Sequence, residues 1–201
     1  MKVVLASQNA HKLREIREIT EKYGLELVLP SELGIRLDVE ETGASFEENS
    51  YLKAKAAMEA TGLGALADDS GICVDALGGE PGIYSARYGF DESLDDWGRL
   101  ELLLRNAQAI PDGSRQAQFV CVITLLCPDG RQLQVRGEVH GELLRAPVGE
   151  GGFGYDPIFY YPPLGKAFAE LTAQEKNRVS HRAVALQKLE EKLKEAGYAD
   201  Q

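Results

Sequence analysis

The stretch from Ala65 to Phe90 constrains the fold more than any other part of the chain; its sequence is ALADDSGICVDALGGEPGIYSARYGF. Its first three residues are apolar, as in a buried strand, and they run directly into the carboxylates Asp68 and Asp69. We expect the strand to end there, because Asp-Ser-Gly favours a turn. Buried carboxylates are costly without a cation or a proton partner, and open α/β sheets place their ligands at strand ends. The acids therefore indicate either a simple turn or the floor of an active site.

Glycines and aromatic residues favour the second alternative. The same stretch is crowded with residues that allow or need close packing: Gly71, Gly78, Gly79, Gly82, Tyr84, Ser85, Arg87 and Tyr88. Glycine lets the backbone approach a neighbouring group closely, so this pattern is typical of a fixed loop. We therefore interpret the stretch as the floor of an active site.

Composition limits the class of protein. With 201 residues, 44% of them hydrophobic, the chain can form one domain over residues 1–201, in one or two lobes. A formal net charge of -10 argues against nucleic-acid binding, which needs a basic face. No apolar run approaches the about 18 residues of a membrane span. The three cysteines lack Cys-x-x-Cys spacing, which predicts buried thiols in a reducing cytoplasm and neither zinc nor a disulfide.

The polar segment SQNAHK, from Ser7 to Lys12, lies between a predicted buried strand over residues 2–6 and a predicted helix from Lys12 to Tyr23. This layout can hold a phosphate, because free backbone N–H groups and the positive end of the helix dipole point at it. The serine and asparagine would donate hydrogen bonds, and Lys12 would add a point charge. Asn9 can also cap the helix, and the two roles do not conflict.

Two acids, Glu40 and Glu41, stand just before another predicted helix. Ser45 and Glu48 have the spacing of a capping box, which starts a helix from Phe46 to Thr61 and explains Glu48 as a cap rather than a catalyst. Capping does not explain Glu40 and Glu41, so they are candidates for binding a metal.

The middle of the chain is predicted to be structural. Ser93 to Asn106 predicts a helix whose inward residues are Leu94, Trp97, Leu100, Leu103 and Leu104. Gln116 to Leu126 and Gln132 to Val139 flank a Pro-Asp-Gly turn and predict a hairpin. Both arms are rich in apolar residues, so we assign them to the core and give them no chemistry.

The glycine-rich segment from Gly149 to Pro163, GEGGFGYDPIFYYPP, lacks the G-x-G-x-x-G spacing and a following helix, so we reject a dinucleotide site. Phe153 and Tyr155 could stack a flat ring from this loop, or could plug the loop itself; both alternatives stay open.

A last helix is predicted from Thr172 to Gly197, starting with a second capping box. Lys176, His181 and Arg182 place positive charge in its first half, which opposes the helix dipole. Such a departure from good helix design indicates a functional demand, with an anion or a hydrogen-bond acceptor as the natural ligand.

Five motifs follow one another along the chain: SQNAHK; EETG with FEEN; ADDSG with GGEPGIYSARY; GGFGYDPIF; and EKNRVSHR. Together they resemble the inosine/xanthosine triphosphatase family of nucleoside triphosphate pyrophosphatases, in its bacterial form, over nearly the whole chain. The resemblance implies an α/β fold with an elongated mixed β-sheet flanked by helices, and two lobes with an active-site cleft between them. It also implies hydrolysis of ITP, dITP and XTP to the monophosphate and pyrophosphate, which clears them from the nucleotide pool, a Mg²⁺ ion, and a homodimer.

The resemblance implies roles for individual residues as well. Asp69 would be the general base for the attacking water, and Glu40 or Glu41 would hold Mg²⁺ together with Asp69. The phosphates would be held by Ser7, Gln8, Asn9, Ala10, His11, Lys12 and Lys53. The base would be surrounded by Phe153, Gly154, Tyr155, Asp156, Lys176, His181 and Arg182, and Ser70 would also bind the substrate.

Two other functions stay open on the residues alone. A nucleotide-binding regulator without turnover would gain nothing from paired acids beside a phosphate loop, unless it binds a metal. A metal-dependent phosphomonoesterase could use Asp68 or Asp69 as a nucleophile, although the acids lack the Asp-x-Asp spacing expected of one. The products distinguish the three functions: pyrophosphate, inorganic phosphate or neither.

Overall fold

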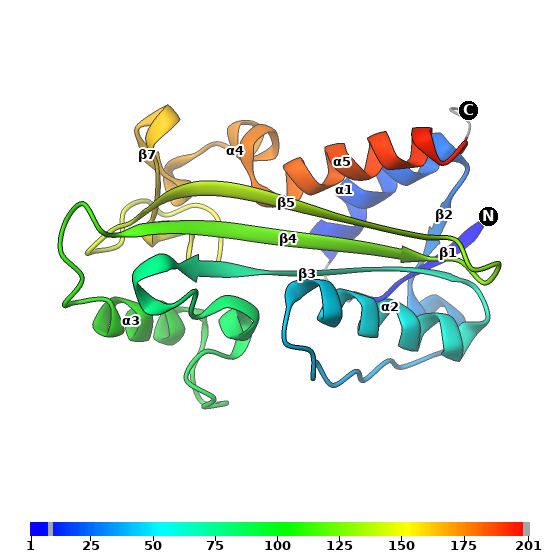
Figure 1. Ribbon diagram of the computed structural model, residues 1–201, viewed down its shortest axis with the longest axis horizontal. Helices are drawn as coiled ribbons and strands as arrows, with labels where there is room; N and C mark the ends of the chain where they lie inside the picture. The colour runs from blue at the N-terminus through cyan, green and yellow to red at the C-terminus, as the bar shows by residue number, and fades with distance from the viewer. Residues whose placement is uncertain (8–9, 199–201) are drawn as a thin grey trace. The chain divides into compact units, whose positions relative to one another are not determined.

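The computed structural model describes residues 1–7 and 10–198, and for residues 10 and 11 it describes the backbone only. The strands are β1 (Lys2–Leu5), β2 (Glu26–Val28), β3 (Gly64–Val74), β4 (Gln116–Leu126), β5 (Gln132–Leu143), β6 (Phe159–Tyr161) and β7 (Lys166–Ala167) (Figure 1). The α-helices are α1 (Ala10–Thr20), α2 (Phe46–Thr61), α3 (Asp96–Asn106), α4 (Ala173–Val179) and α5 (His181–Glu195). Within these described ranges, no helix has both the length and the apolar character needed to cross a membrane.

The strands form one seven-stranded mixed sheet in the order β2-β1-β3-β4-β5-β6-β7. β1 is parallel to β2 and β3, whereas β6 is antiparallel to β5 and β7. Adjacent β4 and β5 are joined by a tight turn, in which the N–H of Cys127 donates to Arg131 O at 2.9 Å and that of Gly130 to Cys127 O at 3.0 Å. The predicted mixed α/β sheet flanked by helices and the predicted hairpin are confirmed, and the second arm extends to Leu143.

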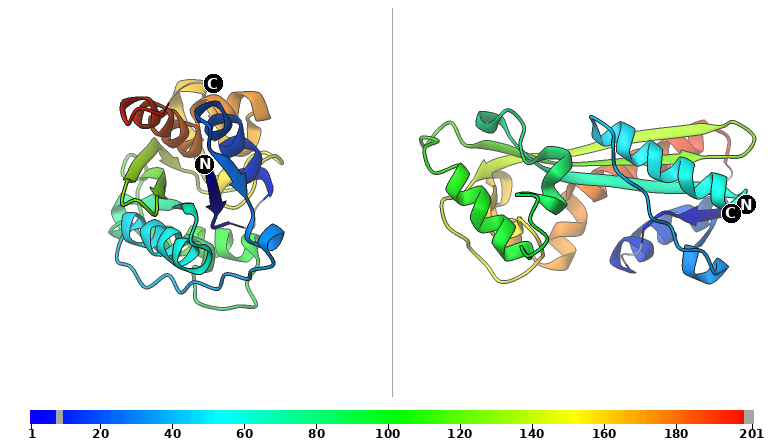
Figure 2. Two further views of the ribbon diagram at one scale, coloured as in Figure 1. Left: turned by 90° about the vertical axis from the view of Figure 1, so that its right-hand side faces the viewer. Right: turned by 90° about the horizontal axis from the view of Figure 1, so that it is seen from below.

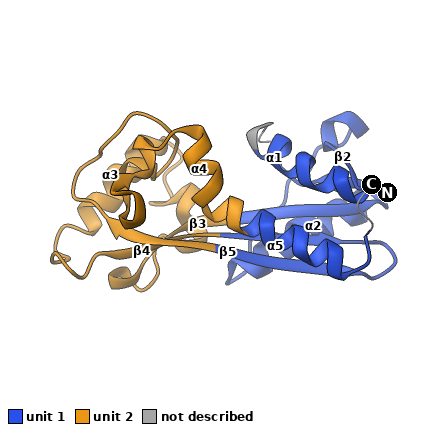
Figure 3. Cartoon of the chain, turned by 90° about the horizontal axis from the view of Figure 1, so that it is seen from above, with its two compact units in different colours: residues 1–69, 121–137, 185–201 blue, residues 70–120, 138–184 orange. Residues whose placement is uncertain are grey.

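The chain divides into two compact units (Figure 3). Unit 1 comprises residues 1–69, 121–137 and 185–201, and unit 2 comprises residues 70–120 and 138–184. Strands β3, β4 and β5 contribute residues to both units. The expectation of a single domain over residues 1–201 stays a prediction.

In unit 1, strands β1 and β3 carry apolar side chains on both faces. The face with Leu5 and Leu66 packs against α1 and α5, and the face with Val4, Ala65 and Ala67 packs against α2. Figures 1 and 2 show α2 on one side of these strands and α1 with α5 on the other. Because successive side chains of a strand point to opposite faces, this alternation also sets the direction of the acids that follow Ala67.

The core of unit 2 is built around three aromatic rings. Phe119 lies 4.5 Å from Phe159 and 5.5 Å from Phe168, measured between ring centroids, and the last two are 4.8 Å apart. Leu100 and Leu103 of α3 pack into the same cluster and are fully buried. Aromatic contacts at these distances stabilise a core beyond the apolar area that they bury.

Strand β3 differs from the sequence-based expectation. It runs unbroken from Gly64 to Val74, so the prediction that it ends at the acids was wrong. The reason lies at Gly71, where a side chain would collide with the carbonyl of Gly82 and with the side chain of Ser85. The Ser85 hydroxyl in turn accepts the N–H of Ile72 at 3.0 Å. Close packing against this strand, rather than a turn, explains the glycine of the Asp-Ser-Gly motif.

The predicted C-terminal helix is two helices. The chain leaves the helical conformation at Ser180, with φ -64° and ψ 157°, which ends α4 and starts α5. The Ser180 hydroxyl accepts the N–H of Ala183 at 3.1 Å and so caps α5. His181 and Arg182 therefore open a new helix instead of lying within the first half of a longer one. The capping box of Thr172 and Glu175 is confirmed at the start of α4.

Helix α3 is shorter than predicted and exposes one residue that was expected to be inward. It begins after Asp95 rather than at Ser93, because the Asp95 carboxylate accepts the N–H of Gly98 at 2.7 Å and caps it. Trp97 is 51% exposed, and its indole N–H donates to Glu101 at 3.0 Å. The inward position predicted for Trp97 was therefore wrong.

A buried arginine joins the loops around β4 and β5 within unit 2. The Arg115 guanidinium donates to the carbonyl oxygens of Leu143 at 2.9 Å, Ala107 at 2.8 Å, Ile110 at 3.0 Å and Leu144 at 3.3 Å. Only 6% of Arg115 is exposed. Its loss would remove a donor from all four carbonyl groups, although Ala107 O would keep the N–H of Ile110 and Ile110 O would keep the guanidinium of Arg145.

We expect Arg115→Leu to lower the free energy of unfolding by about 3 kcal/mol, because it removes the hydrogen bonds that one buried guanidinium donates to four carbonyl groups. Chemical denaturation measures the change. The matched control is Arg105→Ala, which removes an exposed arginine of α3 and should change stability by less than about 0.5 kcal/mol. Equal losses in the two variants would contradict the assignment of Arg115 as a structural link.

Candidate active site

Two adjacent acids of β3 point to opposite faces of the strand and meet different lysines. Asp68 accepts a hydrogen bond from Lys12 of α1 at 2.8 Å. Asp69 lies 3.4 Å from the ammonium group of Lys53, which α2 carries. Both carboxylates are buried, with exposed fractions of 3% and 7%. The strand thus presents one acid to each helix layer of unit 1.

Lys53 links Asp69 to the acids that precede α2. Its ammonium group lies 2.9 Å from Glu41, so one cation contacts two carboxylates. Glu40 is exposed, and of the two candidate acids the structure places Glu41 in this cluster. One oxygen of Asp69, Oδ2, is buried and has no hydrogen-bond partner within the part of the chain that the structure describes.

The electrostatics of this cluster favour a further cation. Burial raises the pKa of Asp69 to about 6, with Lys53 opposing the rise and the Glu41 carboxylate adding to it. Burial also disfavours the charged form of Lys53, but Asp69 and Glu41 outweigh it and its pKa is raised, so the lysine stays a cation. The two carboxylates, when ionised, carry more negative charge than the single ammonium group of Lys53 balances.

The residues present fit a magnesium ion that is shared with a substrate. No group of three or more acidic, histidine or cysteine side chains is arranged as a metal site among residues 1–7 and 10–198. Mg²⁺ does not need one, because it commonly takes one or two carboxylates and completes its shell with water and substrate phosphates. The Oδ2 of Asp69, which has no hydrogen-bond partner among the described residues, can serve as one ligand of such an ion. The neighbouring Glu41 can supply a second ligand.

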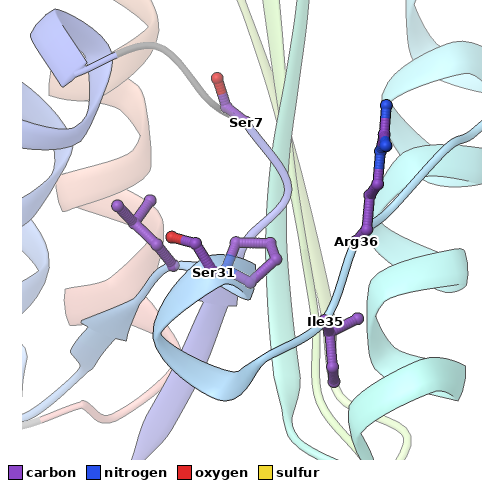
Figure 4. A pocket seen from close by; sticks show the side chains of 6 residues that line it. Ser7, Ser31, Ile35 and Arg36 are labelled. Carbon is purple, nitrogen blue, oxygen red and sulfur yellow. The ribbon is translucent and has the colours of Figure 1, made fainter.

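A cavity of about 440 Å³ in unit 1 borders the predicted phosphate segment (Figure 4). It is lined by Ser7, Leu29, Pro30, Ser31, Ile35 and Arg36. Of the other residues predicted to hold phosphate, Gln8 and Asn9 lie outside the described residues, and so do the side chains of Ala10 and His11. The phosphate role of these four stays a prediction.

Unit 2 brings several of the predicted nucleoside-binding residues together. Phe153 is 57% exposed, and the Lys176 ammonium group lies 4.3 Å from the centre of its ring. The same ammonium group is 2.5 Å from the carboxylate of Asp156, which also accepts the N–H of Phe153 at 3.0 Å. A side chain at Gly152 would collide with this carboxylate. Asp156 thus holds both the loop and the lysine beside an exposed aromatic face.

The two aromatic residues of this loop have different surroundings. Tyr155 is buried, and its hydroxyl donates to the carbonyl oxygen of Ser85 at 2.6 Å. Phe153 is therefore the one of the pair whose ring is available for stacking, whereas Tyr155 anchors the loop in the core of unit 2. Gly154 lies between them with a positive φ of 59°.

The first residues of α5 are buried as well. His181 and Arg182 are each 8% exposed. The His181 ring stacks on Phe119, with ring centroids 4.9 Å apart and planes inclined by 16°. Ser70, which follows the paired acids, is half-buried in β3.

Sequence reasoning missed two residues of unit 1. Asp68 was considered only as a turn former or a nucleophile, yet it pairs with Lys12. Asn49 was not a candidate, although its fully buried side chain accepts the N–H of Gly43 at 2.8 Å, in the segment that carries Glu41. The signal available for Asn49 was a polar residue one helical turn before Lys53, on the same face of α2.

Known proteins resemble this chain over nearly its whole length. The model of the Ham1 family matches residues 3–192. A dITP/XTP pyrophosphatase of Yersinia pestis is 50% identical over 197 residues, which cover 97% of this chain and 99% of that protein. One of Shigella flexneri is 48% identical over 195 residues, covering 96% and 98% respectively.

Solved structures agree with this relationship. The Ham1 protein of Staphylococcus aureus has a TM-score of 0.90 and 43% identity, covering 98% of this chain and all of its own. A HAM1 protein from Coxiella burnetii has a TM-score of 0.90 and 42% identity, covering 97% and 99%. The family model and these relatives, at such identity and coverage, show that the chain belongs to the Ham1 family.

Proposed function

We propose that this protein hydrolyses dITP, XTP and ITP to the nucleoside monophosphate and pyrophosphate, and so clears them from the nucleotide pool. Relatives with about half their residues identical are named dITP/XTP pyrophosphatases, which supports the substrate class. The observation that carries the proposal is the cluster of Asp69, Lys53 and Glu41, in which a buried carboxylate keeps one oxygen without a partner.

The chemistry requires charge neutralisation and a base. A nucleoside triphosphate brings about four negative charges, so its hydrolysis depends mostly on positioning and electrostatic stabilisation. Lys12 and Lys53 would contact the phosphates; each is paired with a carboxylate, Asp68 and Asp69 respectively. Asp69 would take a proton from the attacking water while the water oxygen bonds to phosphorus and the anhydride bond breaks, which releases pyrophosphate. The pKa of about 6 in the metal-free protein leaves the Asp69 carboxylate largely ionised above pH 7, so it can accept this proton.

Mg²⁺ is the proposed cofactor, held by Asp69 and by the Glu40–Glu41 pair, of which Glu41 lies in the cluster. When bound, it would neutralise phosphate charge and polarise the attacking water. Its positive charge would also favour the ionised form of Asp69. A cytoplasmic location and a homodimer belong to the proposal as well; the first is supported by three cysteines that form no disulfide among the described residues, and both by the family resemblance.

Recognition of the base is proposed to rest on donors in unit 2. Hypoxanthine and xanthine carry an oxygen at C6 where adenine carries an amino group. Lys176, His181 and Arg182 would donate hydrogen bonds to that oxygen, and the ring of Phe153, which is 57% exposed, would stack on the base. A site built to donate to an oxygen rejects an amino group, because buried donors are then left unpaired.

The decisive experiment supplies Mg²⁺ and a panel of nucleoside triphosphates, and measures pyrophosphate and inorganic phosphate separately. We expect pyrophosphate from dITP, XTP and ITP. Inorganic phosphate alone would favour a phosphomonoesterase, and binding without either product would favour a regulator.

Asp69→Asn should lose most of its turnover, at least about 100-fold in kcat, because it removes the base and a metal ligand while keeping the shape of the side chain. Substrate binding should persist. The matched control is Asp75→Asn, which changes an exposed acid that follows the same strand. Steady-state kinetics decide the matter: near-normal kcat in Asp69→Asn, or full wild-type activity in EDTA, would contradict the mechanism.

The same substitution should stabilise the metal-free protein. The folded protein holds the Asp69 proton more tightly than the unfolded chain, whose carboxyl titrates near 3.8, so the stability of the wild type falls as pH rises from about 4 to about 6. In EDTA at pH 8, we expect Asp69→Asn to gain on the order of 2 kcal/mol. The gain should vanish below pH 4. Urea unfolding at both pH values tests this, and a variant less stable at pH 8 would refute the argument.

Arg182→Ala should narrow the preference for ITP over ATP by about 10-fold or more, because it removes a donor proposed for the C6 oxygen. The measurement is kcat/KM for ITP, XTP, GTP and ATP. Arg178→Ala, at an exposed position of α4, is the control and should leave the ratio unchanged. An unchanged ratio in Arg182→Ala as well would show that Arg182 does not contact the base.

A further inference from the structure

We propose that Asn49 is a positioning residue for catalysis, and that its side chain fixes the segment carrying Glu40 and Glu41 where it can bind the metal. This inference rests on the proposed function. Asn49 lies in the second turn of α2 and is fully buried. Its Oδ1 accepts the N–H of Gly43 at 2.8 Å, which ties the helix to the segment before it.

This tether is separate from the cap of the helix. The Ser45 hydroxyl accepts the N–H of Glu48 at 3.1 Å, and the Glu48 carboxylate reaches back to the N–H of Ala44 at 2.6 Å. These two bonds serve the start of α2 without Asn49. The bond from Asn49 acts one residue further out, on the segment itself.

Gly43 is fitted to this contact. A Cβ placed there would lie 2.6 Å from Oδ1 of Asn49 and 2.7 Å from Cβ of Glu48. Both distances are too short for a real side chain. Glycine is therefore required by the close approach of the helix, and any larger residue would push the segment away from Asn49.

The tethered segment carries one of the two carboxylates of the cluster. The N–H of Thr42 donates to the carbonyl of Glu40 at 3.1 Å, so the backbone folds tightly just before Gly43. The Glu41 side chain lies 2.9 Å from Lys53, which follows Asn49 by one helical turn. Neighbouring residues of one helix thus hold the backbone and the side chain of this segment.

Asn49 carries two costs that helix stability does not explain. Its Nδ2 is buried and has no hydrogen-bond partner among the residues that the structure describes. Asparagine is also a weak helix former, because its side chain competes for backbone groups. Asn49 lies one turn before Lys53 and is bonded to the segment of Glu41. The position that it gives to the carboxylates explains why asparagine occurs here despite these two disadvantages.

The test separates positioning from stability. Asn49→Ala removes the tether, and Gly43→Ala disrupts it from the other side while keeping Asn49. Ser45→Ala is the matched control, because it weakens the cap of the same helix but leaves the tether. Two readouts are needed: Mn²⁺ affinity of the nucleotide-free protein by electron paramagnetic resonance, and the Mg²⁺ concentration for half-maximal pyrophosphate release from dITP.

We expect Asn49→Ala and Gly43→Ala to weaken Mn²⁺ binding about 10-fold or more, the effect typical of groups that orient metal ligands. The Mg²⁺ requirement should rise in parallel. Ser45→Ala should lower Tm by about 3 °C and leave Mn²⁺ affinity within about twofold. The double variant Gly43→Ala/Asn49→Ala should be no worse than either single variant, since both break one contact.

Mn²⁺ affinity in Asn49→Ala equal to that of the wild type, an equal loss in Ser45→Ala, or no Mn²⁺ binding by the wild type would each overturn the inference. If Asn49→Ala does not fold, Gly43→Ala decides the question alone. Failure of the proposed function is a different outcome: the wild type would then release no pyrophosphate, whatever the tether does to Mn²⁺ binding.

Discussion

The contact of one ammonium group with two carboxylates is the interaction on which the site in unit 1 depends. Lys53 lies 2.9 Å from Glu41 and 3.4 Å from Asp69, and without it two acids would repel each other in a buried place. An ion cluster of this kind can exchange partners, which apolar packing cannot. An incoming triphosphate would attract Lys53 and Lys12, and the carboxylates would be left to a divalent cation. Lys53 thus opposes the rise in the pKa of Asp69 that burial causes, and under the proposed function the substrate would recruit the same lysine.

Unit 2 also contains a buried carboxylate that is paired with a lysine, but here the pair holds a loop. Asp156 is buried, and it is satisfied by the ammonium group of Lys176 and the backbone N–H of Phe153. The acid therefore fixes a loop and aims a cation, while the ring of Phe153 stays exposed. Tyr155, next to it, gives the loop a hydrogen bond into the core. The exposed ring of Phe153 is thus held in place by the bonds of Tyr155 and Asp156, the two residues that follow Gly154.

Local patterns in the sequence predicted the helices with strong caps, the hairpin and the mixed sheet, because each of these rests on residues close in the chain. The motifs also pointed to Asp69, Lys53 and Lys176, which the structure places in two clusters. What failed had two kinds of cause. β3 continues past the acids because of a distant contact, in which Ser85 and its loop pack on Gly71. The last helix breaks for a local reason, because Ser180 caps α5. Lys12 and Asp68 are 56 positions apart in the sequence, so no local pattern predicted their pairing.

The unbroken course of β3 through its two acids has a consequence for how such a chain can change in length. Asp68 shares a face with Leu66 and meets α1, whereas Asp69 shares the other face with Ala65 and Ala67 and meets α2. Inserting or deleting one residue between Gly64 and the acids would turn each carboxylate to the opposite helix, and its lysine would be on the wrong side. Changes by two residues would preserve the parity. The pleat of the strand therefore decides which helix each carboxylate meets, and a single inserted residue would need a bulge to restore both pairings.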